Sequence, residues 1–319
     1  GEANAGLKCM FVMMNHARLW VGLQGLAQAE RALQASVAYA RERRQGRAAR
    51  GGEPGTAADL LIQHSDVRRM LLTQKALVEG SRVLTYFAGM QMDKAAYHPD
   101  PEERRKAADL LAILTPVVKA FVTDAGVEVA NLGIQVHGGH GYIRETGVEQ
   151  FLRDARIACI YEGTNGVQAL DLLGRKVLGS GGQLARLLGG LIGAFCQNHA
   201  GYDDTADFVP RLAGLLKAWS EATERVAQRA ARDPEEVGAA AVDYLQLTAH
   251  LCLAWCWAKM AAVSIAALRR APTDRGFYEA KLATARFYFD RVLPRADGHL
   301  DALDAGADSV MSLPAEQFG

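Results

Sequence analysis

Apolar residues recur at intervals of three or four positions along most of this chain, and this periodicity constrains the fold more than any other feature. Side chains at that spacing lie on one face of an α-helix, whereas a half-buried strand requires strict alternation. Segments with the strand pattern are essentially lacking. The sequence therefore predicts an all-α protein made of two helical bundles. The first stripe comprises Leu19, Leu23, Leu26, Leu33 and Val37.

Glycine and proline clusters divide the helical stretches. The segment QGRAARGGEPGTA, with four glycines and Pro54, ends a first helix expected over about 8–44. YHPDPEE separates a second helix, about 65–92, from a third that Pro116 should kink. The third helix ends at QVHGGHGY, a short helix around VEQFLRDAR follows, and GSGG (179–182) predicts a domain boundary. Beyond it we expect helices over about 183–197, 208–231, 235–270 and 274–305.

Charge and cysteine content exclude several classes of protein. Lysine plus arginine and aspartate plus glutamate each number 36, so the formal net charge is +0 and no nucleic-acid partner is expected. No run of about 18 uninterrupted apolar residues occurs, so we expect no membrane span. The five cysteines lack a zinc-ligand pattern. We interpret them as buried, reduced thiols of a cytoplasmic protein.

One acidic residue has an unusual setting in RDARIACIYEGTNGVQAL (153–170). Glu162 follows the apolar run 157–161 and precedes a turn-like segment that begins with Gly163 and ends with Gly166. A surface acid would normally sit among polar residues. A loop carboxylate backed by apolar groups can instead be desolvated and its basicity tuned, which makes Glu162 a candidate catalytic group.

Two further stretches allow both a structural and a functional interpretation. GIQVHGGHGYIRE is either a tight turn between helices or a place where glycine lets a ligand approach the backbone. It lacks the preceding strand and spacing of a dinucleotide fingerprint. His137 and His140 have no third ligand nearby, so we assign them to packing and expect no metal site. In ARERRQGR, the arginines either complement a helix dipole or bind phosphate.

Taken together, QVHGGHGY, FLRDARI and IYEGTNGVQ resemble the C-terminal helical domain of the acyl-CoA dehydrogenase family. ERRQGR and the opening LKCMFVMMNHARLW match earlier landmarks of the same domain, so the resemblance covers residues 1–178. The region past 180 is similar to a subgroup with an additional C-terminal helical domain, of the 3-methylmercaptopropionyl-CoA dehydrogenase kind. We therefore expect a four-helix bundle over 1–178 and a second helical bundle over 183–319.

The resemblance implies a role for Glu162. In this family the acid of the YEG turn is the base that removes the α proton of an acyl-CoA thioester while the β hydride passes to FAD, giving the 2-enoyl-CoA. The backbone N–H of the same residue binds the thioester carbonyl. Some branches place the base on the first long helix, but this chain has no acidic residue between Glu2 and Glu30, and Ala17 lies beside Arg18.

Other roles follow from the same resemblance, residue by residue. Gly166 replaces a glutamine of some members, so that FAD contact is not expected here. Asn15 replaces an aspartate of some relatives, and a polar pair with Arg18 that only caps an internal groove is the structural alternative. The residues implied to contact FAD are Arg43, Gln45, Gln135, Val136, Gly139 and Thr164, and those implied to contact substrate are Asn15, Arg18, Tyr161 and Gly163.

The resemblance also sets expectations for the whole protein. The family's N-terminal helical and middle β domains are absent from the sequence, so we expect a C-terminal portion with little FAD binding or turnover of its own. The implied partners are an acyl-CoA, electron-transfer flavoprotein and further copies of the chain in a dimer or tetramer. Two alternatives remain open, namely a non-dehydrogenating flavoprotein of the alkylation-response type and an inactive helical oligomerisation module.

Overall fold

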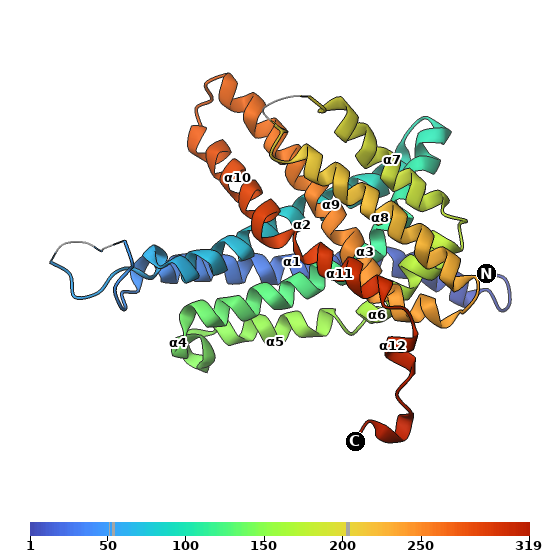
Figure 1. Ribbon diagram of the computed structural model, residues 1–319, viewed down its shortest axis with the longest axis horizontal. Helices are drawn as coiled ribbons and strands as arrows, with labels where there is room; N and C mark the ends of the chain where they lie inside the picture. The colour runs from blue at the N-terminus through green and yellow to red at the C-terminus, as the bar shows by residue number, and fades with distance from the viewer. Residues whose placement is uncertain (51, 53–54, 202–204) are drawn as a thin grey trace. The chain divides into compact units, whose positions relative to one another are not determined.

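The computed structural model describes residues 1–50, 52, 55–201 and 205–319, and its regular elements are helices (Figure 1). Within these residues the β structure is limited to one antiparallel bridge between Arg44 and Leu60. The all-α prediction is confirmed. The α-helices are α1 Gly6–Glu42, α2 Ser65–Tyr97, α3 Pro101–His137, α4 Gly139–Tyr142, α5 Val148–Ala158, α6 Asn165–Leu170, α7 Gln183–Asn198, α8 Val209–Ala230, α9 Glu235–Arg269, α10 Arg275–Phe287, α11 Arg295–Asp304 and α12 Asp308–Met311.

Shorter elements connect these helices. Two π-helices continue α-helices directly, η3 (Asp171–Leu178) after α6 and η5 (Tyr288–Val292) after α10. The 3₁₀ turns that lie wholly within the described residues include η1 (Leu61–Gln63), η2 (Arg144–Thr146) and η6 (Ala315–Gln317). The predicted break at 45–57 is present, although its Pro54 lies outside the described residues. Helix α3 continues past Pro116, and the kink expected there stays a prediction.

The chain forms two compact units. The first comprises residues 1–83 and 122–162, and the second comprises 84–121 and 163–319, so α2 and α3 contribute to both. The domain boundary expected at 179–182 falls within the second unit and stays a prediction.

Close backbone packing holds α1 to α3 in the first unit. A Cβ atom added to Gly25 would lie 2.8 Å from the Thr123 Cα, and one added to Gly126 would lie 2.8 Å from the Gly25 carbonyl oxygen. Only glycine permits this approach. Helix α5 also packs against α1. A core cluster at the far end of α1 joins Ala40 with Met70, Leu71 and Val136.

Helix α9 is the centre of the second unit and packs against α6, α8, α10 and α11. It is buried on several faces, which explains why it is apolar nearly all round. By length and composition alone, α3 and α9 could each cross a membrane, but 78% and 56% of their most apolar windows are buried within the protein. Core helices have the same composition. The expectation of no membrane span stays a prediction.

The last predicted helix, 274–305, differs from the structure. It consists of α10, η5 and α11, with a break at Leu293 and Pro294. Proline has no N–H for an intrahelical bond, so it interrupts a helix and is tolerated at the start of the next one. Pro294 is the N-cap residue of α11. Apolar periodicity continues through the break and therefore did not reveal it.

Candidate active site

Glu162 lies in a short loop whose backbone conformation is uncommon. Helix α5 ends at Ala158, and the Tyr161 N–H still donates to the Ile157 carbonyl at 3.2 Å. Glu162 then has φ +57°, and Gly163 has φ +84°. A non-glycine residue in the left-handed region carries strain and is found mostly where the surrounding structure imposes it. The loop therefore holds this carboxylate at a fixed bend.

The residues on either side of the bend anchor the loop. In the first unit, the Tyr161 hydroxyl donates to the side-chain oxygen of Gln24 on α1. In the second unit, Thr164 caps α6 by accepting the Val167 N–H at 3.3 Å. Asn165 is tied to α3, because its Oδ1 accepts from Lys119 Nζ at 2.8 Å and its Nδ2 donates to the Ala120 carbonyl at 3.1 Å. Thr164 thus has a capping role beside the FAD contact that the resemblance implies.

The surroundings of Glu162 are apolar but not closed. The residue itself is partly buried. Ile157, Ile160 and Tyr161 are 47%, 48% and 38% exposed. The exposed apolar edge would lose water when an apolar ligand covers it, and this loss would raise the basicity of a nearby carboxylate. The arrangement is suited to a base that acts on an apolar substrate.

Helix α1 contributes Arg18, which the resemblance implied as a substrate contact. Arg18 is only 7% exposed and donates from Nη1 to Asn15 Oδ1 at 3.3 Å. Its guanidinium lies 5.9 Å from the centre of the Phe11 ring, and its Nε atom is buried without a partner among the described residues. A buried donor without a partner is costly, so Arg18 is suited to a polar or anionic ligand. Arg18 and Gln24 are six positions apart, about 9 Å along the helix.

A second group of predicted residues lies near the C-terminal end of α1. Tyr39 stacks on His137 with ring centroids 4.3 Å apart, and its hydroxyl is 2.9 Å from His140 Nδ1. His137 Nδ1 also lies 2.7 Å from the Gly133 carbonyl. These contacts show both histidines in packing roles. Among the described residues, no group of three potential ligands could hold a metal ion.

Just after α1, residues 45 and 46 pair with Asp59 through their backbones, and we call this paired segment the finger. Gln45 donates its N–H to the Asp59 carbonyl at 3.0 Å, and Asp59 donates to the Gly46 carbonyl at 2.9 Å. The fully buried Asp59 carboxylate accepts the Ala48 N–H at 2.7 Å and pairs with Arg47 at 3.2 Å. Asp59 thus stabilises the paired residues of the finger.

Arg43 and Gln45 are exposed on this finger, and the Arg43 guanidinium has no hydrogen bond to another described residue. Gln135 and Gly139 are exposed as well, and a Cβ added to Gly139 would meet no atom within 4 Å. Val136 is different, because its side chain belongs to the core cluster and only its backbone can face a ligand.

The predicted site residues therefore fall into separate groups. Asn15, Arg18, Tyr161 and Glu162 belong to the first unit, as do Arg43, Gln45, Gln135, Val136 and Gly139, whereas Gly163 and Thr164 belong to the second. Gln24 and Arg43 are 19 positions apart along α1, about 28 Å. Gln24, Lys119 and Asn165, which hold the loop, were not among the predicted residues. A lone lysine in the apolar run TPVVKAFV was a usable signal for Lys119, which is fully buried.

The fold and this loop define an all-helical protein with a candidate acid–base carboxylate, and comparison with known proteins identifies its family. The profile described as "Acyl-CoA dehydrogenase, C-terminal domain" matches residues 4–178, and one described as "Acetyl-CoA dehydrogenase C-terminal like" matches residues 188–314. The chain belongs to the acyl-CoA dehydrogenase family.

Individual relatives agree with this assignment. The chain is 42% identical to 3-methylmercaptopropionyl-CoA dehydrogenase of Ruegeria pomeroyi over 98% of its own length and 53% of that protein. It is 30% identical to a butyryl-CoA dehydrogenase of Syntrophomonas wolfei over 98% of its length and 51% of that protein. The chain thus spans about half the length of these curated relatives. An acyl-CoA dehydrogenase from Bacillus anthracis, solved with FAD, has the same fold, with a TM-score of 0.74 at 19% identity over 96% of this chain and 51% of the other.

Proposed function

We propose that this chain provides the catalytic base and part of the FAD site for the α,β-dehydrogenation of an acyl-CoA thioester to the 2-enoyl-CoA. Family membership supports the reaction class, and the fixed bend at Glu162 supports the assignment of the base. The similarity to 3-methylmercaptopropionyl-CoA dehydrogenase makes 3-methylthiopropionyl-CoA the first substrate to test. Butyryl-CoA is the second, because the next relative is a butyryl-CoA dehydrogenase.

Glu162 would take the proton. Its carboxylate removes a proton from the α carbon and becomes the neutral acid, a change that an apolar ligand over Ile160 and Tyr161 favours because burial disfavours the charged form. The backbone N–H of Glu162 would donate to the thioester carbonyl and so acidify the α carbon. Arg18 and Asn15 would bind the polar part of the thioester on α1. Tyr161, held by Gln24, keeps the bend in place.

The residues that the resemblance assigns to FAD fit a dinucleotide. Arg43 presents a guanidinium without a partner among the described residues, and guanidinium binds pyrophosphate oxygens in a two-pronged geometry. Gly139 offers open backbone, and Gln45 and Gln135 offer amides. When bound, FAD supplies the acceptor for the β hydride. The spacing of about 28 Å between Gln24 and Arg43 is consistent with the two groups serving different copies of the chain.

Partners follow from the same proposal. The N-terminal part of α1 exposes Leu7, Phe11, Val12 and Met13, which are 70%, 43%, 65% and 60% accessible. An apolar surface of this kind is normally covered by another subunit or by further parts of a longer protein. We propose a homo-oligomer with electron-transfer flavoprotein as the electron acceptor, and a cytoplasmic location.

The test joins this chain to the part of the Ruegeria pomeroyi relative that the match does not cover. We expect anaerobic 3-methylthiopropionyl-CoA to bleach the bound flavin. Glu162→Gln should still bind the thioester but reduce the flavin about 10²–10⁴-fold more slowly, the usual contribution of a positioned base. Glu145→Gln, which neutralises an exposed acid in η2, is the matched control.

Other outcomes separate the alternatives. Flavin reduction by Glu162→Gln at the unaltered rate would disprove the assignment of the base. A fusion that retains FAD but is bleached by neither thioester would favour the non-dehydrogenating flavoprotein. A folded fusion that binds neither FAD nor thioester would favour the oligomerisation module.

A further inference from the structure

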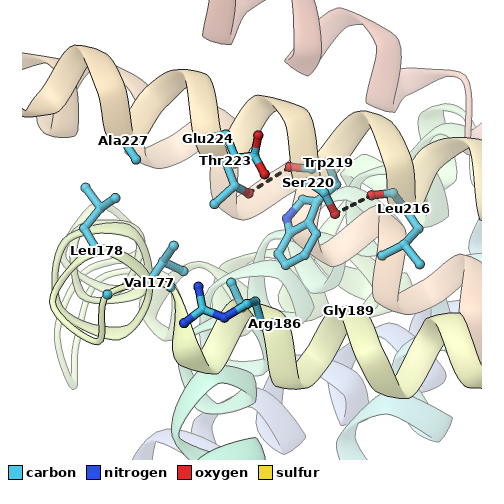
Figure 2. Close-up of a pocket in the computed structure, with 13 residues that line it drawn as sticks. Val177, Leu178, Arg186, Gly189, Leu216, Trp219, Ser220, Thr223, Glu224 and Ala227 are labelled. Carbon is cyan, nitrogen blue, oxygen red and sulfur yellow. Dashed lines mark hydrogen bonds between the residues drawn. The ribbon is translucent and has the colours of Figure 1, made fainter.

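A cavity of about 460 Å³ lies between α7 and α8, and none of its lining residues belongs to the candidate active site (Figure 2). Sites for small molecules commonly enclose about 300–1,000 Å³ and combine apolar walls with a few polar groups. One wall comes from α8, and the other comes from the turn after η3 and from α7. The residues that carry the argument are Val177, Gly182, Arg186, Leu216, Trp219 and Glu224.

The interior of the cavity is apolar, and a hydrogen bond holds its largest side chain, Trp219, in place. Figure 2 shows the Trp219 indole pointing from α8 toward α7. This side chain is 2% exposed, and its Nε1–H donates to Thr248 Oγ1 at 2.9 Å, so its polar atom is already satisfied. A Cβ added to Gly189 would lie 3.5 Å from the indole. Any larger residue at position 189 would therefore occupy the space beside Trp219. Val177 and Leu216 complete an apolar lining.

The opposite end of the cavity carries one cation, the exposed Arg186, which also lines a neighbouring surface pocket with Glu102, Glu103 and Asp109. A Cβ added to Gly182 would lie 2.8 Å from Arg186 Nη1, so the guanidinium rests in the space that this glycine leaves open. Gly182 has φ +77° and is the N-cap residue of α7, a helix of 16 residues with no acid in its first turn. The N-terminus of such a helix is electropositive. The backbone N–H of Arg186 donates to the Gly182 carbonyl at 2.9 Å, but the guanidinium makes no hydrogen bond or ion pair with another described residue.

The remaining polar lining groups do not provide a second anion-binding position. Ser220 donates its hydroxyl to the Leu216 carbonyl at 2.9 Å, and Thr223 donates to the Trp219 carbonyl at 2.8 Å, so both hydroxyl protons are in use. Glu224 is exposed at the rim, on the opposite side of the cavity from Arg186 in Figure 2. An anion can therefore bind at the Arg186 end and is repelled on the Glu224 side.

We propose that this cavity binds an amphipathic monocarboxylate, such as a free fatty acid. The carboxylate accepts hydrogen bonds from Arg186 at the start of α7, and the alkyl chain lies along Trp219 between Val177 and Leu216. Three features favour this chemical class. The Arg186 guanidinium has no partner among the described residues, and the N-terminus of α7 carries no acid. The wall formed by Trp219 is apolar, because its Nε1–H already donates to Thr248. The site does not depend on the dehydrogenase proposal.

Calorimetric titration of the full 319-residue chain with octanoate tests the proposal. We expect saturable binding that weakens at least about 10-fold in Arg186→Gln, because a charge-assisted hydrogen bond is lost. Gly189→Leu should abolish binding by filling the space beside Trp219. Arg232→Gln removes an exposed arginine outside the cavity and should bind octanoate unchanged. 1-Octanol, which has the chain but no charge, should bind at least about 10-fold more weakly than octanoate.

Two further measurements locate the ligand. 8-Bromooctanoate should quench tryptophan fluorescence in the unaltered protein but not in Trp219→Phe, provided that this variant keeps its melting transition. Glu224→Gln should bind octanoate more tightly, because a like charge is removed. Absence of binding at millimolar octanoate, undiminished binding by Arg186→Gln, or weaker binding by Glu224→Gln would each overturn the proposal.

Discussion

The Tyr161 hydroxyl donates a hydrogen bond to the side-chain oxygen of Gln24, across 137 positions of sequence. Tyr161 precedes Glu162 directly, and Gln24 lies in the middle of α1, which is supported from behind by the close approach of Gly25 to α3. The loop that carries Glu162 is therefore tied to a closely packed part of α1. A bond between neighbouring residues of a loop could not fix the bend in this way.

Removal of this hydrogen bond should increase the local flexibility of the loop around Glu162. In Gln24→Met, the amides of residues 160–163 should exchange hydrogen faster, while the global free energy of unfolding falls by only about 1 kcal/mol, the usual net value of one hydrogen bond. Hydrogen exchange with peptide-level resolution measures the first quantity, and urea unfolding measures the second. Gln34→Met, on the same helix, is the control. Unchanged exchange in this segment would contradict the anchoring role.

Asn165 accepts a hydrogen bond from the fully buried Lys119, which predicts a stability cost when the acceptor is removed. Asn165→Leu should lower the free energy of unfolding by about 2 kcal/mol, because the buried ammonium loses one of its acceptors. Urea unfolding curves check this value.

A double-substitution cycle separates the bond from general packing. Lys119→Met combined with Asn165→Leu should cost clearly less than the sum of the two single changes, because no buried charge then remains to be satisfied. Strict additivity would show that the two side chains do not act on each other.

The left-handed backbone at Glu162 predicts an unusual relation between stability and function. Glu162→Gly removes the penalty of a side chain in this conformation, which stabilises the folded chain by about 1–2 kcal/mol. The greater freedom of glycine in the unfolded chain takes back about 0.4–1 kcal/mol of this gain. The stability of this variant should therefore equal or exceed that of the unaltered chain, although the base is lost. Glu162→Val should be less stable by about 1 kcal/mol, since a branched Cβ suits this conformation poorly. Thermal unfolding of the three chains decides the order.

Burial is the main reason, and the nearby His299 and Arg295 a smaller one, that the pKa of His250 is lowered to about 3. The ring lies against Phe121 and stacks on His299, whose Nδ1 is 2.8 Å from Asp243. The unfolded chain takes up a proton near pH 6.5 that the folded chain takes up only near pH 3. The free energy of unfolding should therefore fall by about 1.4 kcal/mol for each unit by which the pH is lowered from 6.5 to 3.

His250→Phe checks the origin of this slope. It keeps a ring of similar size in the same place, and the Tyr288 hydroxyl can still donate to the carbonyl of residue 250. The decline below pH 6.5 should become shallower by about 1.4 kcal/mol per unit. Replacement of the exposed His16 by glutamine is the control. The same steep decline in His250→Phe, measured by urea unfolding at several pH values, would assign the acid sensitivity to other groups.

The sequence was sufficient for the features that local chemistry determines. Apolar periodicity predicted the all-α class and most helix positions, because a helix that buries one face repeats about every 3.6 residues. Glycine and proline clusters predicted the interruptions at 45–57 and 97–103, because these residues prevent regular helix. The motif around Glu162, read with the glycine-rich stretch at 138–141, was enough to indicate the family, which the comparisons confirm.

Only the tertiary structure decided which of these residues are held in place by contacts with distant parts of the chain. The positive φ of Glu162 is unfavourable for a non-glycine residue and could not be predicted from its side chain, and the hydrogen bond of the adjacent Tyr161 to Gln24 is a contact across 137 positions. The cavity beside Trp219 likewise depends on Gly189 from another helix. Contacts between residues far apart in sequence leave no periodic trace, because each depends on how whole helices pack, and local propensity does not encode that packing.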